Sequence, residues 1–375
     1  MTKIKIDGFQ LFCMMFIFIL GSTLLLDIGK AARQDAWIVP LLATFFGCLL
    51  YLVYISLYKR YPNMPLTGYL IKIWGKYVGG AISFCYIIYF VYIASRVLRD
   101  FEELLISSSY YVTSIITLGI CMTFVLIYST HLGIEAFARV TCLCFVVILL
   151  TLFILNILYV VGGYIKVENL QPVLANGWGN IGKELVPLGI TVPFGELITF
   201  TMILPYLNKK NQAATIGLSA IIIGGITLTI NSIILLCVLG PETVLRSSFP
   251  ALTAVSYINI ASFIQRLDTF ILILMVILGF VKITIYFFCA VIGAADLFRM
   301  KPSVTNIYLI GGVIFFSSLM IAPSYQAHIN EGLKIVPYLL HLPFHIAIPI
   351  LLLITAYIKQ KIKPTLSREG RLLFF

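Results

Sequence analysis

Long apolar runs, separated by short polar connections, fill the sequence from end to end. Each run is continuous over about 20 residues, the length of a membrane-spanning helix, whereas barrel strands would alternate over about ten. The pattern therefore predicts an all-α polytopic membrane protein with about ten transmembrane helices. The predicted spans are 9–26, 36–58, 81–105, 113–130, 136–161, 185–207, 214–239, 263–290, 305–322 and 335–358.

Two of these runs are interrupted near the middle, at corresponding places in the two halves of the chain. The first contains Gly21-Ser22-Thr23, and the sixth contains Pro193-Phe194-Gly195-Glu196. Proline removes a backbone donor, glycine loosens a helix and a carboxylate is costly in hydrocarbon. Paired broken helices are typical of transporter folds with a central ligand site. We therefore predict that helices 1 and 6 are broken.

The connections support two halves of inverted topology. Leu66, Tyr69, Leu70 and Ile73 recur at helical spacing between spans 2 and 3, and the short apolar stretch 251–260 lies between spans 7 and 8. We expect one surface helix on each side of the membrane. The predicted organisation is one integral membrane domain, 1–375, with a five-plus-five inverted repeat of 1–161 and 185–358 and a basic tail at 359–375.

Composition and charge agree with this interpretation. Hydrophobic residues make up 61% of the chain and charged residues 11%, against about 25% charged in soluble domains. In the predicted layout one side of the membrane carries 16 Lys and Arg residues and the other carries 6. This bias places both termini in the cytoplasm, with lipid rather than nucleic acid as the partner of the basic loops. The eight cysteines lie in apolar runs without CxxC spacing, so neither disulfides nor a zinc site is expected.

The two breaks are the candidate ligand site. Gly21 is about 18 Å from the start of its helix, near the midplane, and Glu196 reaches a similar depth from the other side. Free amides and carbonyls at such breaks suit the carboxylate and ammonium of an amino acid. A packing patch at Gly21 and a simple kink at Pro193 are the structural alternatives. The candidate ligand-binding residues are Gly21, Ser22, Thr23, Phe194, Gly195, Glu196 and Thr284, although Thr284 has the alternative of bonding its own helix.

Charged residues inside the spans form a second group. Arg96–Asp100 and Arg99–Glu103 have i,i+4 spacing on the third span. We expect these four, with Glu102 and with Arg266 and Asp268 on the eighth span, to form one scaffold network, with a role in coupling as the alternative. Lys282 is either a buried cation beside a pathway or a lysine that reaches the interface.

No catalytic centre is indicated. His341 and His345 are four residues apart, a metal-binding spacing, but no third ligand is evident, so we expect no metal site. No phosphate-binding loop, nucleophile elbow or dinucleotide fingerprint occurs. The chain is therefore expected to be neither an enzyme nor a cofactor protein.

Several segments together resemble the permease-type B subunits of spore germinant receptors, the GerAB family. The segments are GFQLF at 8–12, FILGST at 18–23, QDAWI at 34–38, IASRVLRDF at 93–101, PFGE at 193–196, LPY at 204–206 and QRLD at 265–268.

This resemblance implies a member of the amino acid–polyamine–organocation transporter superfamily, with a LeuT-like five-plus-five repeat, in the inner membrane of the spore. It also implies a membrane-embedded A subunit and a lipoprotein C subunit as partners. The implied function is to bind a nutrient germinant, often an amino acid, between the two breaks and to signal to these subunits. A proton- or cation-coupled amino acid permease is the alternative, and a membrane anchor for the partner subunits is a third.

Overall fold

Helices make up the core of the protein. The computed structural model describes residues 5–108, 110–258, 268–300 and 303–369, without the side chains of 25–26, 268 and 362–369. Within these ranges the chain contains no named strand, and the single bridge joins Ile6 to Leu207. The polytopic all-α fold predicted from the sequence is therefore confirmed.

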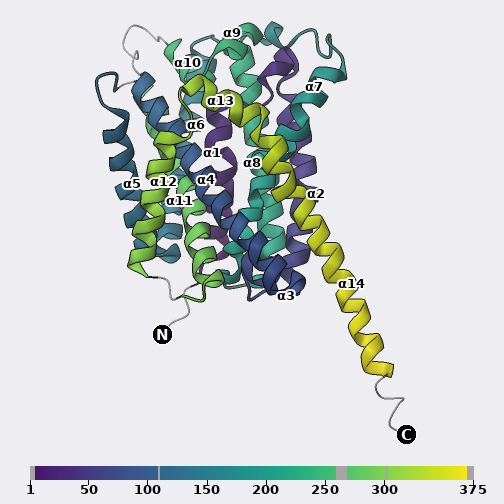
Figure 1. Cartoon of the computed structure of the whole chain (residues 1–375). Helices are drawn as coiled ribbons and strands as arrows, with labels where there is room; N and C mark the ends of the chain where they lie inside the picture. Colours follow the sequence, from purple (N-terminus) through teal and green to yellow (C-terminus); the bar gives the residue numbers. More distant parts are fainter. Residues whose placement is uncertain (1–4, 109, 259–267, 301–302, 370–375) are drawn as a thin grey trace.

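Long apolar helices form the membrane-spanning bundle (Figure 1). They are α2 (Ile38–Arg60), α4 (Lys76–Ser108), α5 (Ile115–Leu132), α6 (Ile134–Val161), α8 (Ala213–Leu239), α11 (Asp268–Leu297), α12 (Val304–Met320), and the π-helical η7 (Pro337–Ala347) that continues into α14 (Ile348–Glu369). Seven segments of the described chain are long and apolar enough to span a membrane, or eight if α12 and α13 (Tyr325–Lys334), bent by 105°, count as one span. The ten-helix count and the inverted repeat stay predictions.

The two predicted breaks are present. α1 (Gly8–Leu26) has non-helical torsion angles at Gly21 (φ 14°, ψ −127°). The sixth run consists of short pieces with a turn at 192–194. These pieces are α7 (Trp178–Glu184), the π-helical η3 (Leu185–Gly189), and the 3₁₀ segments η4 (Gly195–Met202) and η5 (Leu204–Tyr206). An eight-residue 3₁₀ segment is unusually long, and such segments often mark hinges or strained sequence.

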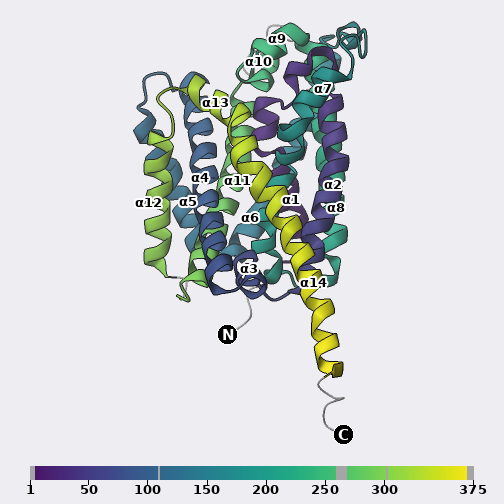
Figure 2. The ribbon, with the colours of Figure 1, turned by 45° about the vertical axis from the view of Figure 1, so that its right-hand side comes forward.

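Short helices cap the two ends of the bundle. The amphipathic α3 (Leu66–Trp74) lies at the end where both termini emerge, and α13, α9 (Pro241–Arg246) and α10 (Pro250–Ser256) lie at the opposite end (Figures 1 and 2). We call these the α3 end and the α13 end. Three 3₁₀ turns complete the chain, η1 (Lys30–Asp35), η2 (Val167–Leu170) and η6 (Lys210–Gln212). The surface helix predicted at 66–73 is confirmed, and its four periodic apolar residues are buried.

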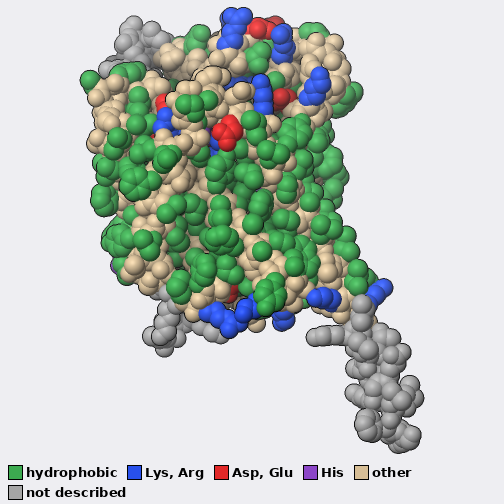
Figure 3. Space-filling model, in the orientation of Figure 1, with side chains coloured by type: hydrophobic (Ala, Val, Ile, Leu, Met, Phe, Trp, Pro, Cys, Tyr) green, Lys and Arg blue, Asp and Glu red, His purple; other side chains and the backbone are tan. Residues whose placement is uncertain are grey.

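α1 is the central element of the bundle, and it packs against α8, α11 and α6. Nearly every side chain from Leu11 to Leu20 is fully buried. Large apolar side chains of α5, α6 and α12 are instead exposed, and Figure 3 shows a broad hydrophobic belt with Lys and Arg below it at the α3 end and with both basic and acidic side chains above it at the α13 end. Since an apolar belt suits the lipid, α1 and the central parts of η4 and α11 are the protein's interior.

Candidate functional site

An ion pair joins the two broken segments at the centre of the bundle. The ammonium Nζ of Lys282 on α11 lies 2.6 Å from Glu196 Oε2 on η4 and donates a second hydrogen bond, 3.0 Å long, to Ser22 Oγ at the α1 break. It also lies 5.3 Å from the centre of the Phe18 ring. The two charged side chains are only 1% and 4% exposed. Lys282 therefore ties three elements together in the buried centre of the bundle.

Glycine at the α1 break makes this contact feasible. A Cβ atom on Gly21 would lie 2.6 Å from Cδ of Lys282, closer than real Cβ contacts. Gly195 has a similar role beside η7, since a Cβ there would lie 2.8 Å from His345 Nδ1. Tyr54 supports the same place by hydrogen bonding to the carbonyl oxygens of Gly195 (3.0 Å) and His345 (2.7 Å). The two glycines are therefore required by close packing as well as by the breaks.

The burial of Lys282 decides between the two sequence-based interpretations. Its side chain is fully buried, so it is not a lysine whose head reaches the interface. A buried ion is costly unless its partner and hydrogen bonds compensate, and here Glu196 and Ser22 supply both. The sequence predicted a carboxylate inside the membrane at Glu196 and left Lys282 open between the interior and the interface, and it did not predict that the two form a pair.

The remaining predicted ligand residues are less closely gathered. Thr23 and Phe194 line a small cavity of about 10 Å³ that faces α2. Oγ1 of Thr23 has no hydrogen-bond partner among the described residues, whereas Thr284 donates to the Phe280 carbonyl of its own helix over 2.7 Å. The geometry thus groups Gly21, Ser22 and Glu196, and a ligand-binding role for each of the seven stays a prediction.

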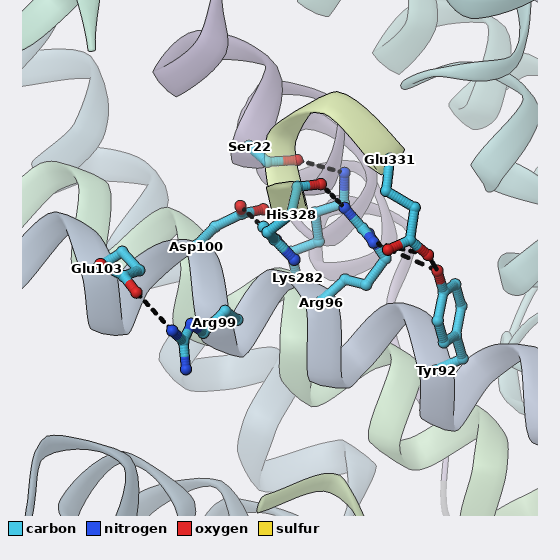
Figure 4. Close-up of polar contacts among 9 residues, drawn as sticks. All are labelled: Ser22, Tyr92, Arg96, Arg99, Asp100, Glu103, Lys282, His328 and Glu331. Atoms are coloured by element: carbon cyan, nitrogen blue, oxygen red, sulfur yellow. Dashed lines mark hydrogen bonds and ion pairs between the residues drawn. The ribbon is translucent and has the colours of Figure 1, made fainter. Parts of the chain in front are cut away.

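A second charged cluster lies between α4 and α13 (Figure 4). Asp100 Oδ1 is 2.9 Å from His328 Nε2, and Arg96 Nη1 is 3.6 Å from Glu331 Oε1. Arg96 also donates to the His328 carbonyl and to the Tyr92 hydroxyl, which itself donates to Glu331 over 2.9 Å. Charges on α4 thus hold α13 against the bundle.

One expectation for these charges is wrong, and another stays a prediction. Arg99 Nη2 and Glu103 Oε1 form the predicted i,i+4 pair at 2.7 Å, but Arg96 and Asp100 turn to α13 rather than to each other. A cross-element partner competes with the local one because α13 brings both a carboxylate and an imidazole to α4. Arg266 and the side chain of Asp268 lie outside the described residues, so their predicted membership of the network stays a prediction.

A cavity of about 70 Å³ connects the central pair with the α4–α13 cluster. That volume is roughly the space of two water molecules in liquid water. Its polar lining comes from Ser22 and Glu196 on one side, Arg96 and Asp100 on the other, and His341 of η7. The two groups of residues that the sequence suggested separately, ligand residues and scaffold charges, therefore face one cavity.

Sequence reasoning missed the α13 residues and the place of His341 in this cavity. His341 is 4% exposed, and neither ring nitrogen has a hydrogen-bond partner among the described residues. It stacks on His345, with ring centroids 4.8 Å apart, and His345 in turn shares a 2.7 Å hydrogen bond with the Tyr89 hydroxyl. The apolar face of 325–334, bearing His328, was the available signal for α13. Because the segment 325–334 also carries charged residues, its sequence is typical of a polar loop.

Comparison with known proteins now adds to this geometry. The family model described as "Spore germination protein" matches residues 5–326, most of the chain. The chain belongs to this family of spore germination proteins. Among relatives from Bacillus subtilis (strain 168), spore germination protein KB is 38% identical over 96% of this chain and 97% of its own length. Spore germination protein YndE is 25% identical over 73% and 74%, and spore germination protein A2 is 24% identical over 90% and 95%.

Membership of the spore germination family accords with the resemblance found in the sequence. It supports a receptor-type role in spore germination for a multi-pass membrane protein, in a family that is not a known enzyme family. The matched region ends at residue 326, so η7 with His341 and most of α13 lie beyond it, although the likeness to protein KB extends over nearly the whole chain.

Proposed function

We propose that this protein is the nutrient-sensing B-type subunit of a spore germinant receptor and that the nutrient binds in the cavity between the central ion pair and α13. The observation that carries the proposal is the lining of this cavity, which joins both helix breaks to a charged cluster on a peripheral helix. A small nutrient, with an amino acid as the first candidate, contacts Ser22 and Glu196 at one side and Arg96 at the other.

Signalling follows from the same arrangement. In the structure the cavity is small and α13 is held to α4 by Arg96 and Asp100. A nutrient larger than about two water molecules requires the cavity walls to move apart, so it favours a state in which α13 or the broken segments have shifted. The protein thus converts nutrient binding into a change of shape at its α13 end, which partner subunits detect.

The partners and the location are part of the proposal. The partners are an A-type membrane subunit and a C-type lipoprotein subunit, and the location is the spore inner membrane with both termini in the cytoplasm. The unequal distribution of Lys and Arg supports this orientation, because the α3 end carries Lys59, Lys72, Lys209 and Lys210. The α13 end then faces the side from which a nutrient arrives.

Filling the cavity tests the proposal. Val97 lines the cavity and is 4% exposed, and Val97→Phe places a ring in it. Val125→Phe is the matched control, because Val125 is 54% exposed on the lipid-facing side of α5. In spores that carry each variant, we expect Val97→Phe to raise the nutrient concentration needed for germination by about tenfold or more, which corresponds to about 1.4 kcal/mol of binding free energy. Val125→Phe keeps the wild-type dose dependence.

The measurement needs equal amounts of protein in the spore membrane, shown by immunoblotting. An unchanged dose dependence for Val97→Phe at equal abundance contradicts binding in this cavity. A nutrient screen against wild-type spores and spores that lack this protein identifies the nutrient for the experiment.

A proton- or cation-coupled permease is the second candidate, favoured by the buried Lys282–Glu196 pair. Paired ionisable groups inside a membrane bundle are typical of ion-coupled transport. Uptake of labelled amino acid into proteoliposomes that contain this protein alone distinguishes the two functions. We expect binding without accumulation, and concentrative uptake abolished by Glu196→Gln supports the permease.

A further inference from the structure

A lipid-facing groove between α6 and α8 has a polar stripe that nothing in the described chain covers. The groove encloses about 480 Å³, and both helices pack on α1 behind it. Leu149, Phe153 and Asn156 line it from α6, and Thr227, Ile230 and Asn231 line it from α8. The α6 residues repeat at intervals of four and three over about two turns, and Ile230 and Asn231 lie three and four residues after Thr227, about one turn along α8, so the stripe follows the helix axes.

The amides of Asn156 and Asn231 have unused hydrogen-bonding capacity. Each side chain is half-buried, and neither makes a hydrogen bond within the described part of the chain. Thr227 differs, since its hydroxyl donates to the Ile223 carbonyl over 2.8 Å. An asparagine offers two donors and one acceptor oxygen, so two asparagines leave several groups without partners.

The depth of the two amides in the membrane makes their missing hydrogen bonds costly in free energy. At 1.5 Å per residue, Asn231 lies about 12 Å from the α13 end of α8, and Asn156 lies about 8 Å from the same end of α6. The whole of α8 is about 40 Å long against a hydrocarbon core of about 30 Å, so Asn231 is in the hydrocarbon and Asn156 is near its edge. Water does not reach Asn231 there, and lipid tails do not form hydrogen bonds.

We propose that this groove is the docking site for a transmembrane helix of another protein in the receptor assembly. The partner helix presents Ser, Thr, Asn or Gln to the two amides and small or apolar residues to Leu149, Phe153 and Ile230. Polar side chains of this kind join helices inside membranes. The volume and the lengthwise stripe fit the side chains of one helix laid along the groove.

A second copy of this chain is a poorer occupant. A symmetric pair brings the same face of each copy together, so groove meets groove and the hollow stays unfilled. Lipid fills the hollow but leaves the amides without partners. The proposal therefore commits to a helix from a different chain, and it does not depend on where the nutrient binds.

Site-specific photo-crosslinking in spore membranes tests the proposal with a matched pair of positions. Phe153 in the groove is 65% exposed and Phe124 on α5 is 64% exposed. Each lies about 12–14 Å from the α13 end of its helix. With p-benzoylphenylalanine at each position in the full receptor, we expect a protein adduct from position 153 whose crosslinked peptide lies in an apolar span with a polar residue. Position 124 forms lipid adducts alone.

The asparagines supply the second test. Asn156→Leu and Asn231→Leu each reduce the yield of the position-153 adduct by about threefold, the loss of one interhelical hydrogen bond. The isolated protein keeps or gains thermal stability, because a polar group without a hydrogen-bond partner has been removed from hydrocarbon. A fall in that stability instead assigns the asparagines a structural role within the chain. Such a fall, lipid adducts at both positions, an adduct with a second copy of this chain, or an adduct unaffected by both substitutions overturns the proposal.

Discussion

The central ion pair and the α4–α13 cluster use the same kinds of residues in different surroundings. Lys282 and Glu196 are 1% and 4% exposed, and each has the other as its oppositely charged partner. In the α4–α13 cluster Arg96 is 8% exposed but Glu331 is 35% exposed. Arg96 also donates hydrogen bonds to Tyr92 and to a backbone carbonyl. The charges at the centre are thus concentrated in one buried pair, whereas the α13 contact is distributed over several partners.

Breaking the central pair should have the largest effect. Lys282→Met leaves Glu196 as a buried carboxylate without its partner, and removing one member of a buried pair costs about 3–5 kcal/mol. We expect the variant to accumulate poorly in membranes and to unfold at lower temperature after purification in detergent.

The double variant Lys282→Met with Glu196→Gln is the control for that loss. It removes both charges and should recover most of the stability, since a buried pair replaced as a unit is often nearly neutral. Spores that carry the double variant should still germinate abnormally. Equal destabilisation by the single and the double variant would show that Lys282 acts through packing rather than through its charge.

Adding one methyl group at the α1 break should have the next largest effect. Gly21→Ala sets Cβ 2.6 Å from Lys282 Cδ and displaces the lysine stem, for which overpacking costs about 1–3 kcal/mol. Gly312→Ala in α12 is the control, because its Cβ meets nothing within 4 Å. There the gain in helix propensity stabilises by up to about 1 kcal/mol. Thermal unfolding in detergent compares the two, and equal stabilisation by both substitutions would contradict the close contact.

These contacts show which parts of the site were predictable from sequence. The spans and the breaks at Gly21 and Glu196 are local features, because glycine, proline and charge interrupt an apolar run wherever they occur. The partner of Glu196 is 86 residues away along the chain, and no local pattern indicates which buried cation will meet it. The same holds for Arg96. Its i,i+4 spacing favours a pair with Asp100, but in the structure its partner is Glu331 on α13.

Loss of a single contact in the α4–α13 cluster should have an intermediate effect. Asp100→Ala leaves the buried His328 ring without its acceptor, at a cost of about 1–3 kcal/mol, whereas Asp100→Asn retains an oxygen for it. We expect Asp100→Ala to loosen α13 and to change the nutrient dose dependence. Asp100→Asn should change the mobility of α13 and the nutrient dose dependence less than Asp100→Ala does. Hydrogen exchange in 325–334, measured by mass spectrometry, reports on α13 directly. Exchange as slow in Asp100→Ala as in the wild type would mean that the Asp100–His328 contact does not hold this helix.

The smallest effects should come from the i,i+4 pairs along single helices, and they set the scale for the others. Arg99–Glu103 is 11% and 20% exposed, whereas Arg139–Glu135 on α6 is 69% and 44% exposed. Solvent screens the second pair, so Arg139→Gln should cost at most about 0.5 kcal/mol, and less at high salt. Arg99→Gln should cost more, because partial burial weakens the screening. Unfolding at low and high salt tests this order. If Arg139→Gln costs as much as Arg99→Gln, burial does not rank these charges, and the contrast between the central pair and the α4–α13 cluster needs another cause.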